Sequence, residues 1–392
     1  MNRIQIVALT FALPFFAVAA ADSSAETGVS DKEILIGSCS DHTTETQKTR
    51  SELRLQGAKA YFGYVNEAGG VHGRKIKLIE EDDAYDPGQA IVCFNRLMTD
   101  SVFAGAFFIG GPTAAKYAPL GEKNKVPLIG FVAGAKFLYD PVKKYVFPVR
   151  GSYEDMIEGT VGKLVDVSPK KVGIIFQEDA FGAGSYEALK SVLKKRNAEP
   201  VVAAGVMHGS SDIEKALAQL RAAKPDVVVM ALVAEPAASL LTKSREAKWN
   251  PTFVSISNNP TMFKLAGDAM NGVVLPEVLP TPDRIDLPAI DQFVKLMKQR
   301  FPAAKPNATA LEGFAESMVI VEGLKRAGKN LTRDGFVAAF ESMGNVDLGF
   351  GPEFRVSYGP TDHQAFSAIY PTIVKGGKPV HVSDWRKLDN GS

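Results

Sequence analysis

The chain has 392 residues and a formal charge of +1, with 45 lysines and arginines against 44 aspartates and glutamates. This balance, without a basic stripe or polybasic cluster, argues against nucleic acid and against a charged membrane surface as partners. Residues 1–21 combine a positive start, an apolar run and Ala19-Ala20-Ala21, which predicts a secretory signal peptide. The alternative is a membrane anchor, but the apolar run is short and contains Pro14. We therefore expect export through the Sec pathway, cleavage near Ala21 and a periplasmic protein.

About 370 residues would follow the cleavage site, which is more than one hydrophobic core usually serves, so we expect two domains. Short β-rich runs alternate with amphipathic stretches in the first half. Strands are predicted at 32–37, 74–83, 102–110 and 126–132, and helices at 51–70, 86–100 and 114–124. The helix over 51–70 places Leu55, Ala58, Phe62 and Val65 on one face.

The same rhythm restarts in the second half. Strands are predicted at 170–179, 199–207, 225–233, 251–257 and 271–279, and helices at 185–197, 211–223, 236–249, 287–301, 310–328 and 333–343, followed by a β-like tail from 346. Alternating strands and helices with nearly continuous apolar strands are typical of parallel sheets covered on both faces. The fold class is therefore α/β, with two doubly wound lobes. Segments 145–152 and 276–288 are the expected crossings between them.

Four motifs occur in one order along the chain: AYFGYVNEAGGVHGRKIKLIEEDDAYDPGQA, NKVPLIGF, EDAFGAG and EGFAESMVIVEGLKRAG. This ordered set resembles the periplasmic solute-binding proteins of ABC importers, in the branch named for leucine, isoleucine and valine. The resemblance runs from about residue 32 to the end. It implies a Venus flytrap of two Rossmann-like lobes, a three-segment hinge and a ligand in the cleft. It also implies one lobe from 31–148 plus 276–352 and a second from 149–275 plus 353–392.

Ligands of open parallel sheets lie beyond the carboxyl ends of the strands, which directs attention to a few corners. The first is Gly110-Gly111-Pro112-Thr113, where glycines and a helix start could hold an anion. It lacks the dinucleotide and P-loop patterns, and the chain has no G-x-S-x-G elbow. From the residues alone, a tight turn without a ligand is an equal alternative. The resemblance favours a ligand carboxylate or similar polar head here, near Gly111 with Thr113 as the hydroxyl donor.

The second corner contains Ala133, Gly134 and Ala135, after the fourth strand. In the family this loop often adds a serine or threonine hydroxyl to the same carboxylate. Here only backbone N–H groups could serve, which argues against an ordinary clamp for an α-amino acid.

The third corner contains Asp41 and His42, after the first strand. Three interpretations are open: a solvated loop, a polar contact to the ligand and, least favoured, a catalytic pair. Adjacent residues rarely converge on one metal and no Cys/His spacing supports zinc, so no metal site is expected.

In the second lobe, Asp179 and Phe181 follow a strand. The resemblance puts Phe181 in the place of an aromatic that closes over the ligand, although packing beneath the hinge is an alternative. Glu235 and Asn258 follow two further strands. Amino-acid receptors of this family usually have a carboxylate near the latter position to hold the ammonium. Glu235 could substitute for it, or could simply favour a helix N-terminus.

The two cysteines, Cys39 and Cys93, are a candidate disulfide, since an exported protein can keep such a bond. The helix that carries Cys93 would cross over the first strand if the strand order is 2-1-3-4.

The leading functional hypothesis is a substrate-binding component that delivers a small molecule to an inner-membrane permease and ATPase. The expected ligand has a carboxylate or polar head and an apolar or aromatic body, such as an amino acid, an aromatic acid or an amide. The alternative is a sensor of the same fold that signals to a membrane receptor. An exported hydrolase is disfavoured, because no histidine lies beside an evident nucleophile. We expect no catalysis, no cofactor and a monomer.

Overall fold

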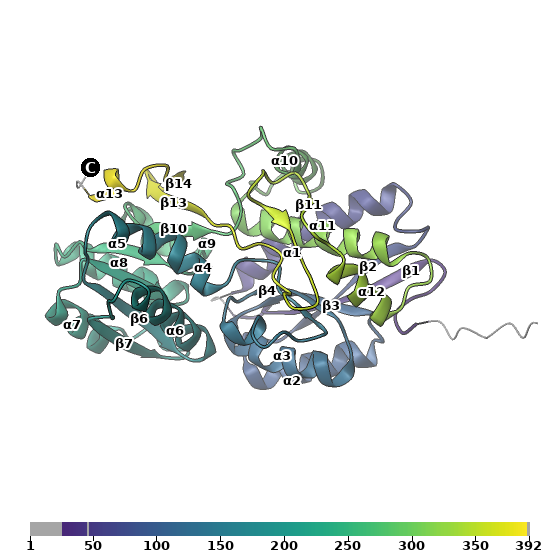
Figure 1. Ribbon diagram of the computed structural model, residues 1–392, viewed down its shortest axis with the longest axis horizontal. Coiled ribbons are helices and arrows are strands. Elements are labelled where there is room, and N and C mark those ends of the chain that lie inside the picture. The colour runs from purple at the N-terminus through teal and green to yellow at the C-terminus, as the bar shows by residue number, and fades with distance from the viewer. Residues whose placement is uncertain (1–25, 45–46, 390–392) are drawn as a thin grey trace, which may run out of the picture.

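Two α/β lobes lie side by side along the long axis of the computed structural model (Figure 1). The structure describes residues 26–44 and 47–389, so the predicted signal peptide lies outside the described residues. Within these residues no helix combines the length and the apolarity that crossing a membrane requires.

The first lobe contains a parallel five-stranded sheet in the order β2-β1-β3-β4-β5. Its strands are β1 (Glu33–Ser40), β2 (Lys75–Asp82), β3 (Ala104–Ile109), β4 (Leu128–Val132) and β5 (Val146–Phe147). Figure 1 shows two helices below this sheet, α2 (Pro87–Thr99) and α3 (Gly111–Asn124). The helices that pack on the other face are α1 (Lys48–Glu67), α10 (Pro288–Arg300), α11 (Ala308–Ala327) and α12 (Arg333–Glu341). Each face buries its own hydrophobic cluster.

The second lobe contains a seven-stranded sheet in the order β14-β13-β10-β9-β8-β6-β7. Its strands are β6 (Val172–Glu178), β7 (Val202–Met207), β8 (Val227–Ala231), β9 (Thr252–Ser255), β10 (Val274–Glu277), β13 (Tyr370–Lys375) and β14 (Lys378–His381). The helices are α4 (Tyr153–Ile157), α5 (Lys163–Val167), α6 (Ala180–Lys194), α7 (Glu214–Ala223), α8 (Ala234–Glu246), α9 (Pro260–Ala266) and α13 (Arg386–Asp389). A separate ribbon pairs β11 (Val346–Asp347) with β12 (Arg355–Val356).

The predicted fold class of two doubly wound lobes is confirmed, and every predicted strand and helix has an observed counterpart. Several short elements were not predicted, among them the helix over 153–167, α9, α13 and the two-residue β5. The first of these contains a π-helical turn, Glu158–Gly162, between α4 and α5. The tail adds β13 and β14 as antiparallel strands at one edge of an otherwise parallel sheet.

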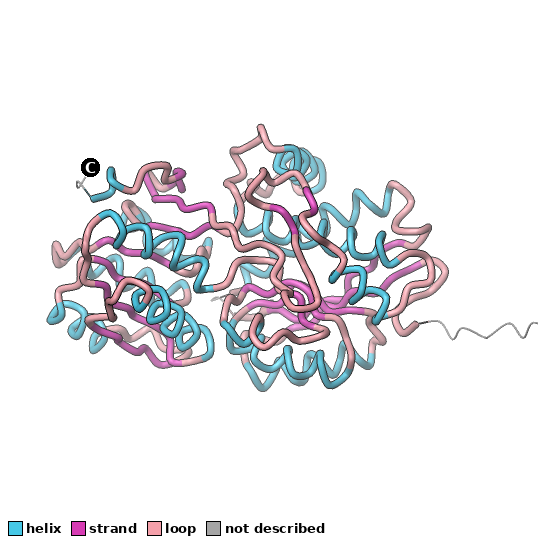
Figure 2. Tube along the Cα trace, in the orientation of Figure 1, coloured by secondary structure: helices cyan, strands magenta, loops and turns pink. Residues whose placement is uncertain are grey.

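Three loop segments join the lobes, as Figure 2 shows. The first leads from Val149, in the core of the first lobe, to Tyr153 in that of the second. The second lies between Val278 and Leu279, which belong to opposite cores. The third follows Phe366 and leads to β13 of the second sheet. The expected boundaries at 276 and 353 differ from this arrangement, because β10 continues to Glu277 and Phe366 still packs in the first core. We propose boundaries after Val278 and after Phe366 instead.

A disulfide joins Cys39 of β1 to Cys93 of α2, with their Cα atoms 6.1 Å apart. This is the candidate pair from the sequence, and the strand order β2-β1-β3-β4 is the one on which that pairing depended. Both cysteines are fully buried. The bond ties the end of β1 to the helix that covers it, close to the corner that contains Asp41.

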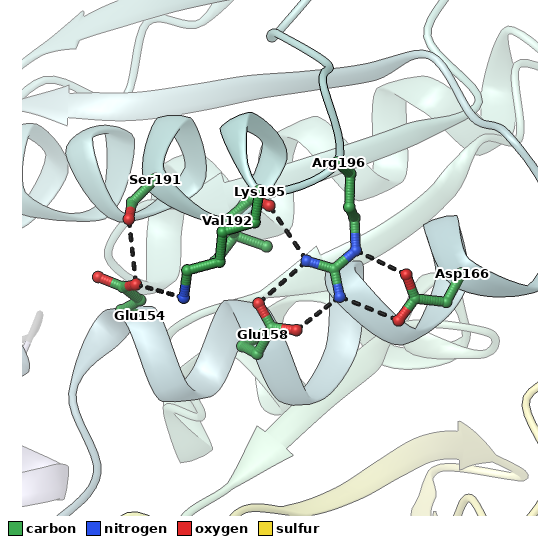
Figure 3. Close-up of polar contacts among 7 residues, drawn as sticks. All are labelled: Glu154, Glu158, Asp166, Ser191, Val192, Lys195 and Arg196. Carbon is green, nitrogen blue, oxygen red and sulfur yellow. Dashed lines mark hydrogen bonds and ion pairs between the residues drawn. The ribbon is translucent and has the colours of Figure 1, made fainter.

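An ion cluster fastens the helix over 153–167 to the end of α6, as Figure 3 shows. Arg196 contacts Glu158 through both terminal nitrogens and Asp166 through Nε and Nη2. Its Nη1 also donates to the carbonyl of Val192 at 3.1 Å. Each of the three guanidinium nitrogens therefore has a partner, and the cluster holds the π-helical turn against the lobe.

Candidate ligand-binding site

The site is built on the close approach of α1 and α11. A Cβ added at Gly57 would lie 1.8 Å from the carbonyl oxygen of Ala310, and one at Gly313 would lie 2.0 Å from that of Arg54. Glycine is therefore required at both positions for the helices to touch. This contact sets two arginines of α1 at i and i+4, Arg50 and Arg54, against two glutamates of α11 with the same spacing.

Arg54 and Glu316 form a buried pair within this cluster. Arg54 donates from Nε to Oε2 of Glu316 at 3.1 Å and from Nη2 to Oε1. Glu312 lies further away, with its Oε1 3.7 Å from Nη1 of Arg54 and 3.5 Å from Nε of Arg150. Burial would raise the pKa of Glu312, but the nearby Arg150, Arg54 and Arg50 hold this pKa below its ordinary value.

Arg50 is a buried cation of the cluster with an incomplete set of partners. Its side chain donates from Nη1 to the hydroxyl of Ser257 in the other lobe at 3.2 Å, while its Nε has no hydrogen-bond partner among the described residues. Arg50 is only 5% exposed. Burial lowers its pKa to about 10, so the guanidinium is still cationic at neutral pH. A buried cation without a close anion is costly, and a bound anion would relieve that cost.

Two adjoining voids meet at Arg50, Arg150 and Ile256, between the lobes. One, with a cavity volume of about 20 Å³, is lined also by Asn258, Glu277, Ala308, Thr309 and Glu312. The other, also of about 20 Å³, is lined also by Tyr85, Gly110, Gly111, Tyr153, Phe181 and Ser257. We refer to the two voids together as the inner cavity. Its walls come from the carboxyl ends of strands in both sheets and from the first turn of α11.

Tyr85 closes one side of the inner cavity from an unusual backbone conformation. Ala84 and Tyr85 both have positive φ, 50° and 56°, which is uncommon for residues other than glycine and is often found at functional sites. The ring of Tyr85 stacks on His208 of the second lobe, with centroids 5.8 Å apart. Gly110 leaves room for this ring, because a Cβ there would lie 2.3 Å from it.

Glu277 and Asn258 form a polar pair at the other end of the inner cavity. The amide of Asn258 donates to Oε1 of Glu277 at 2.6 Å. Burial raises the pKa of Glu277 to about 7, against the weaker opposing effects of this hydrogen bond and of the arginines. Near neutral pH this carboxyl is therefore partly protonated, and the arginines give the inner cavity a cationic character.

Comparisons with known proteins identify the family of this chain. The family described as periplasmic binding protein matches residues 17–378. The chain belongs to this family. The Leu/Ile/Val-binding protein of Citrobacter freundii is 26% identical over 232 residues, which cover 57% of this chain and 62% of that protein. The chain thus spans about three fifths of the curated relatives it matches first.

Two solved structures share the fold of this periplasmic binding protein over most of its length. A possible leucine/isoleucine/valine-binding protein from Rhodopirellula baltica has a TM-score of 0.85 at 24% identity, covering 94% of this chain and all of the other. A fatty acid ABC transporter substrate-binding protein from Thermomonospora curvata has a TM-score of 0.81 at 25% identity, covering 93% and 96%. The resemblance to the Leu/Ile/Val branch is confirmed, and both family and fold are those of binding proteins.

Three of the predicted ligand-binding residues, Gly111, Phe181 and Asn258, line the inner cavity of this binding protein. Gly111 and Phe181 face each other across the lobes, since a Cβ at Gly111 would lie 2.7 Å from the backbone nitrogen of Phe181. Thr113 does not line it. Its hydroxyl donates to the carbonyl of Ile109 at 2.5 Å, which uses its single proton. The structure therefore does not bring the Thr113 hydroxyl to the inner cavity, and its expected role as donor to a ligand stays a prediction.

The second corner lies between the lobes but contributes less than expected. Gly134 and Ala135 line a separate outer groove, and the carbonyl of Gly134 accepts a 2.7 Å hydrogen bond from the N–H of Tyr153. Ala133 is fully buried. None of the three lines the inner cavity. Val132, the last residue of β4 and the residue just before this loop, does line it.

Four further candidates also lie outside the inner cavity. Asp41 accepts hydrogen bonds from Thr43 and Thr44 of its own loop, and the N–H of His42 donates to Asp82. Asp179 caps α6 and lies 2.8 Å from Nδ1 of His208. Glu235 is half-buried in the first turn of α8. The carboxylate of Asp41 is thus hydrogen-bonded within its own loop, and that of Asp179 is engaged by the N-terminus of α6 and by His208.

The strongest polar residues of the inner cavity were missed by the sequence analysis: Arg50, Arg150 and Glu277. A signal was present for the first. Two arginines four residues apart near the start of one helix, and two glutamates four apart in another, are complementary pairs on helix faces. Arg150 lies on a lobe crossing, where no periodicity marks the direction of a side chain, and Glu277 is the last residue of β10, next to a second crossing.

Proposed function

We propose that this protein is the extracytoplasmic substrate-binding component of an ABC importer. It binds a small carboxylate-headed molecule between Arg50 and Arg150 and delivers this molecule to a membrane permease. The observation that carries the proposal is the buried guanidinium of Arg50, which has one neutral partner, Ser257, and an unpaired Nε among the described residues. A planar carboxylate fits a guanidinium by paired, charge-assisted hydrogen bonds.

Other groups support an anion at the same place. The first turn of α11, at Ala308 and Thr309, lines the inner cavity, and the N-terminus of a helix favours negative charge. The ligands for which the relatives are named, leucine, isoleucine, valine and a fatty acid, all carry a carboxylate. Among the predicted ligands, amino acids and aromatic acids therefore fit better than amides.

Binding would act by holding the lobes together. Arg50 belongs to the first lobe and its partner Ser257 to the second, so a ligand bound to Arg50 touches both. Such a ligand stabilises the closed population by its differential affinity for that state. A charge-assisted hydrogen bond contributes about 1.5–3 kcal/mol, so two of them and an apolar body could reach the roughly −8 kcal/mol of a micromolar complex.

The test is a ligand screen on the mature protein, using amino acids, aromatic acids, short aliphatic acids and the amides of each. Calorimetry should find binding for at least one acid and much weaker binding for its amide. Small-angle scattering should show compaction with that acid only. Equal affinity for an acid and its amide, or no binding by any acid, would contradict the proposal. Loss of uptake of the same acid on deletion of the protein would then test delivery to a permease.

A further inference from the structure

A second hollow, open to solvent, lies against the inner cavity. It shares four lining residues with the inner cavity: Asn258, Glu277, Ala308 and Thr309. Its volume is about 540 Å³, against about 20 Å³ for each part of the inner cavity. We call it the proline groove, after the residues that form its walls.

Apolar side chains from both lobes form these walls: Pro260, Phe263, Pro282, Pro306 and Pro379. All five are half-buried, so each keeps part of its apolar surface uncovered. Pro260 and Phe263 belong to α9 of the second lobe, and Pro306 lies just before α11 of the first. Polar and charged residues, such as Asp283 and Lys378, add to the lining and are exposed.

The inner cavity and the proline groove therefore adjoin at Asn258, Glu277, Ala308 and Thr309 and differ in character. The inner cavity contains Arg50 and Arg150, while the proline groove is mainly apolar. We propose that the ligand is an elongated amphiphilic carboxylate, whose head lies at Arg50 and Arg150 and whose apolar tail occupies the proline groove. This inference rests on the proposed function and specifies its substrate class.

The head and the tail of such a ligand would contribute separately to the free energy of binding. The arginines recognise the head alone and cannot distinguish a short acid from a long one. Uncovered apolar surface on rigid proline rings, in contrast, gains from covering by a tail and loses little conformational freedom. Each methylene that enters such a groove should raise affinity about three- to fourfold. The length of the tail, and not the head, would then set specificity.

Calorimetry with unbranched monocarboxylates from butyrate to octanoate tests this. We expect the affinity of the wild-type protein to rise by more than tenfold along the series. Phe263→Ala and Pro282→Glu should each remove at least fivefold of the gain for octanoate and leave butyrate unchanged. Leu265→Ala is the matched control, because Leu265 lies on the same helix, is exposed and does not line the groove. It should change neither affinity.

Phe263 also packs partly against the core of the second lobe, so Pro282→Glu provides an independent variant in a loop. Affinity that rises with length in wild type and falls in both variants supports the proposal. Equal affinity for short and long acids overturns the groove assignment but leaves the carboxylate site standing. A length effect that neither variant alters also overturns it. Failure of every acid to bind overturns both the groove and the proposed function.

Discussion

Two arginines of this protein occupy opposite situations. Arg196, on the surface of the second lobe, has a partner for each guanidinium nitrogen, from Glu158, Asp166 and a backbone carbonyl (Figure 3). Arg50, between the lobes, is more deeply buried and has a single hydroxyl partner. The bonds to Glu158 and Asp166 raise the pKa of Arg196 above its ordinary value, whereas burial lowers that of Arg50.

The difference shows how a binding site can be recognised in a closed molecule. Arg196 is fully used within its own lobe and has nothing left to offer a ligand. Arg50 carries a charge whose partner is incomplete, and buried polar groups are normally satisfied. An incomplete partner set in a cavity between two lobes therefore indicates a ligand, whereas a complete set indicates structure.

The largest expected effect is on ligand affinity after Arg50→Gln. Loss of a charge-assisted pair with the ligand head should weaken binding of the best acid about 100-fold. The free energy of unfolding of the ligand-free protein should stay the same or rise, because the variant removes a poorly paired buried cation. Calorimetry and urea denaturation measure the two effects separately. Unchanged affinity would show that the incomplete partner set of Arg50 does not indicate the ligand site.

The pH dependence of stability tests the acid of the same cavity, Glu277. Its pKa is raised by burial to about 7 from an ordinary 4.5, so the folded state binds a proton more tightly than the unfolded state. This contribution is fully present below pH 4.5 and is lost as pH rises through 7, at a total cost of roughly 3 kcal/mol. Urea denaturation of the ligand-free protein should show wild type losing stability relative to Glu277→Gln between pH 5 and pH 8.

Glu158 and Asp166 of the Arg196 cluster provide the opposite dependence. Their hydrogen bonds to Arg196 lower the pKa of both carboxyls, so their contribution is present at neutral pH and is lost as pH falls. The acid limb should thus persist in Glu277→Gln while the loss towards pH 8 disappears. A variant with the same pH profile as wild type would contradict the burial argument for Glu277.

The sequence predicted the fold far better than the site. Alternation of apolar strands with amphipathic helices repeats along the chain, so the pattern of the adjacent elements supports the prediction of each one. Gly111, Phe181 and Asn258 were found because they follow strands, where parallel sheets place their ligands. Thr113 follows such a strand as well, but its hydroxyl donates to the carbonyl of Ile109. This local side-chain-to-backbone hydrogen bond competes with binding of a ligand.

The charged residues of the inner cavity could not be predicted in the same way. Arg50 faces Ser257 across more than 200 residues of sequence, and only the closure of two lobes brings them together. Arg150 and Glu277 lie beside lobe crossings, whose paths depend on the packing of both lobes. What sequence could offer was the i, i+4 spacing of the arginines and glutamates, which predicts two charged helix faces but not that they meet.

The smallest expected effect is that of Arg196→Met, which tests the structural side of the contrast. Arg196 is 16% exposed and its partners Glu158 and Asp166 are 36% and 50% exposed, so solvent screens these pairs. The variant should lower the free energy of unfolding by only about 1 kcal/mol. Because the cluster lies within one lobe, ligand affinity should be unchanged in the same calorimetric assay used for Arg50→Gln. A loss of affinity comparable to that of Arg50→Gln would mean that complete pairing does not separate structural from ligand-binding arginines here.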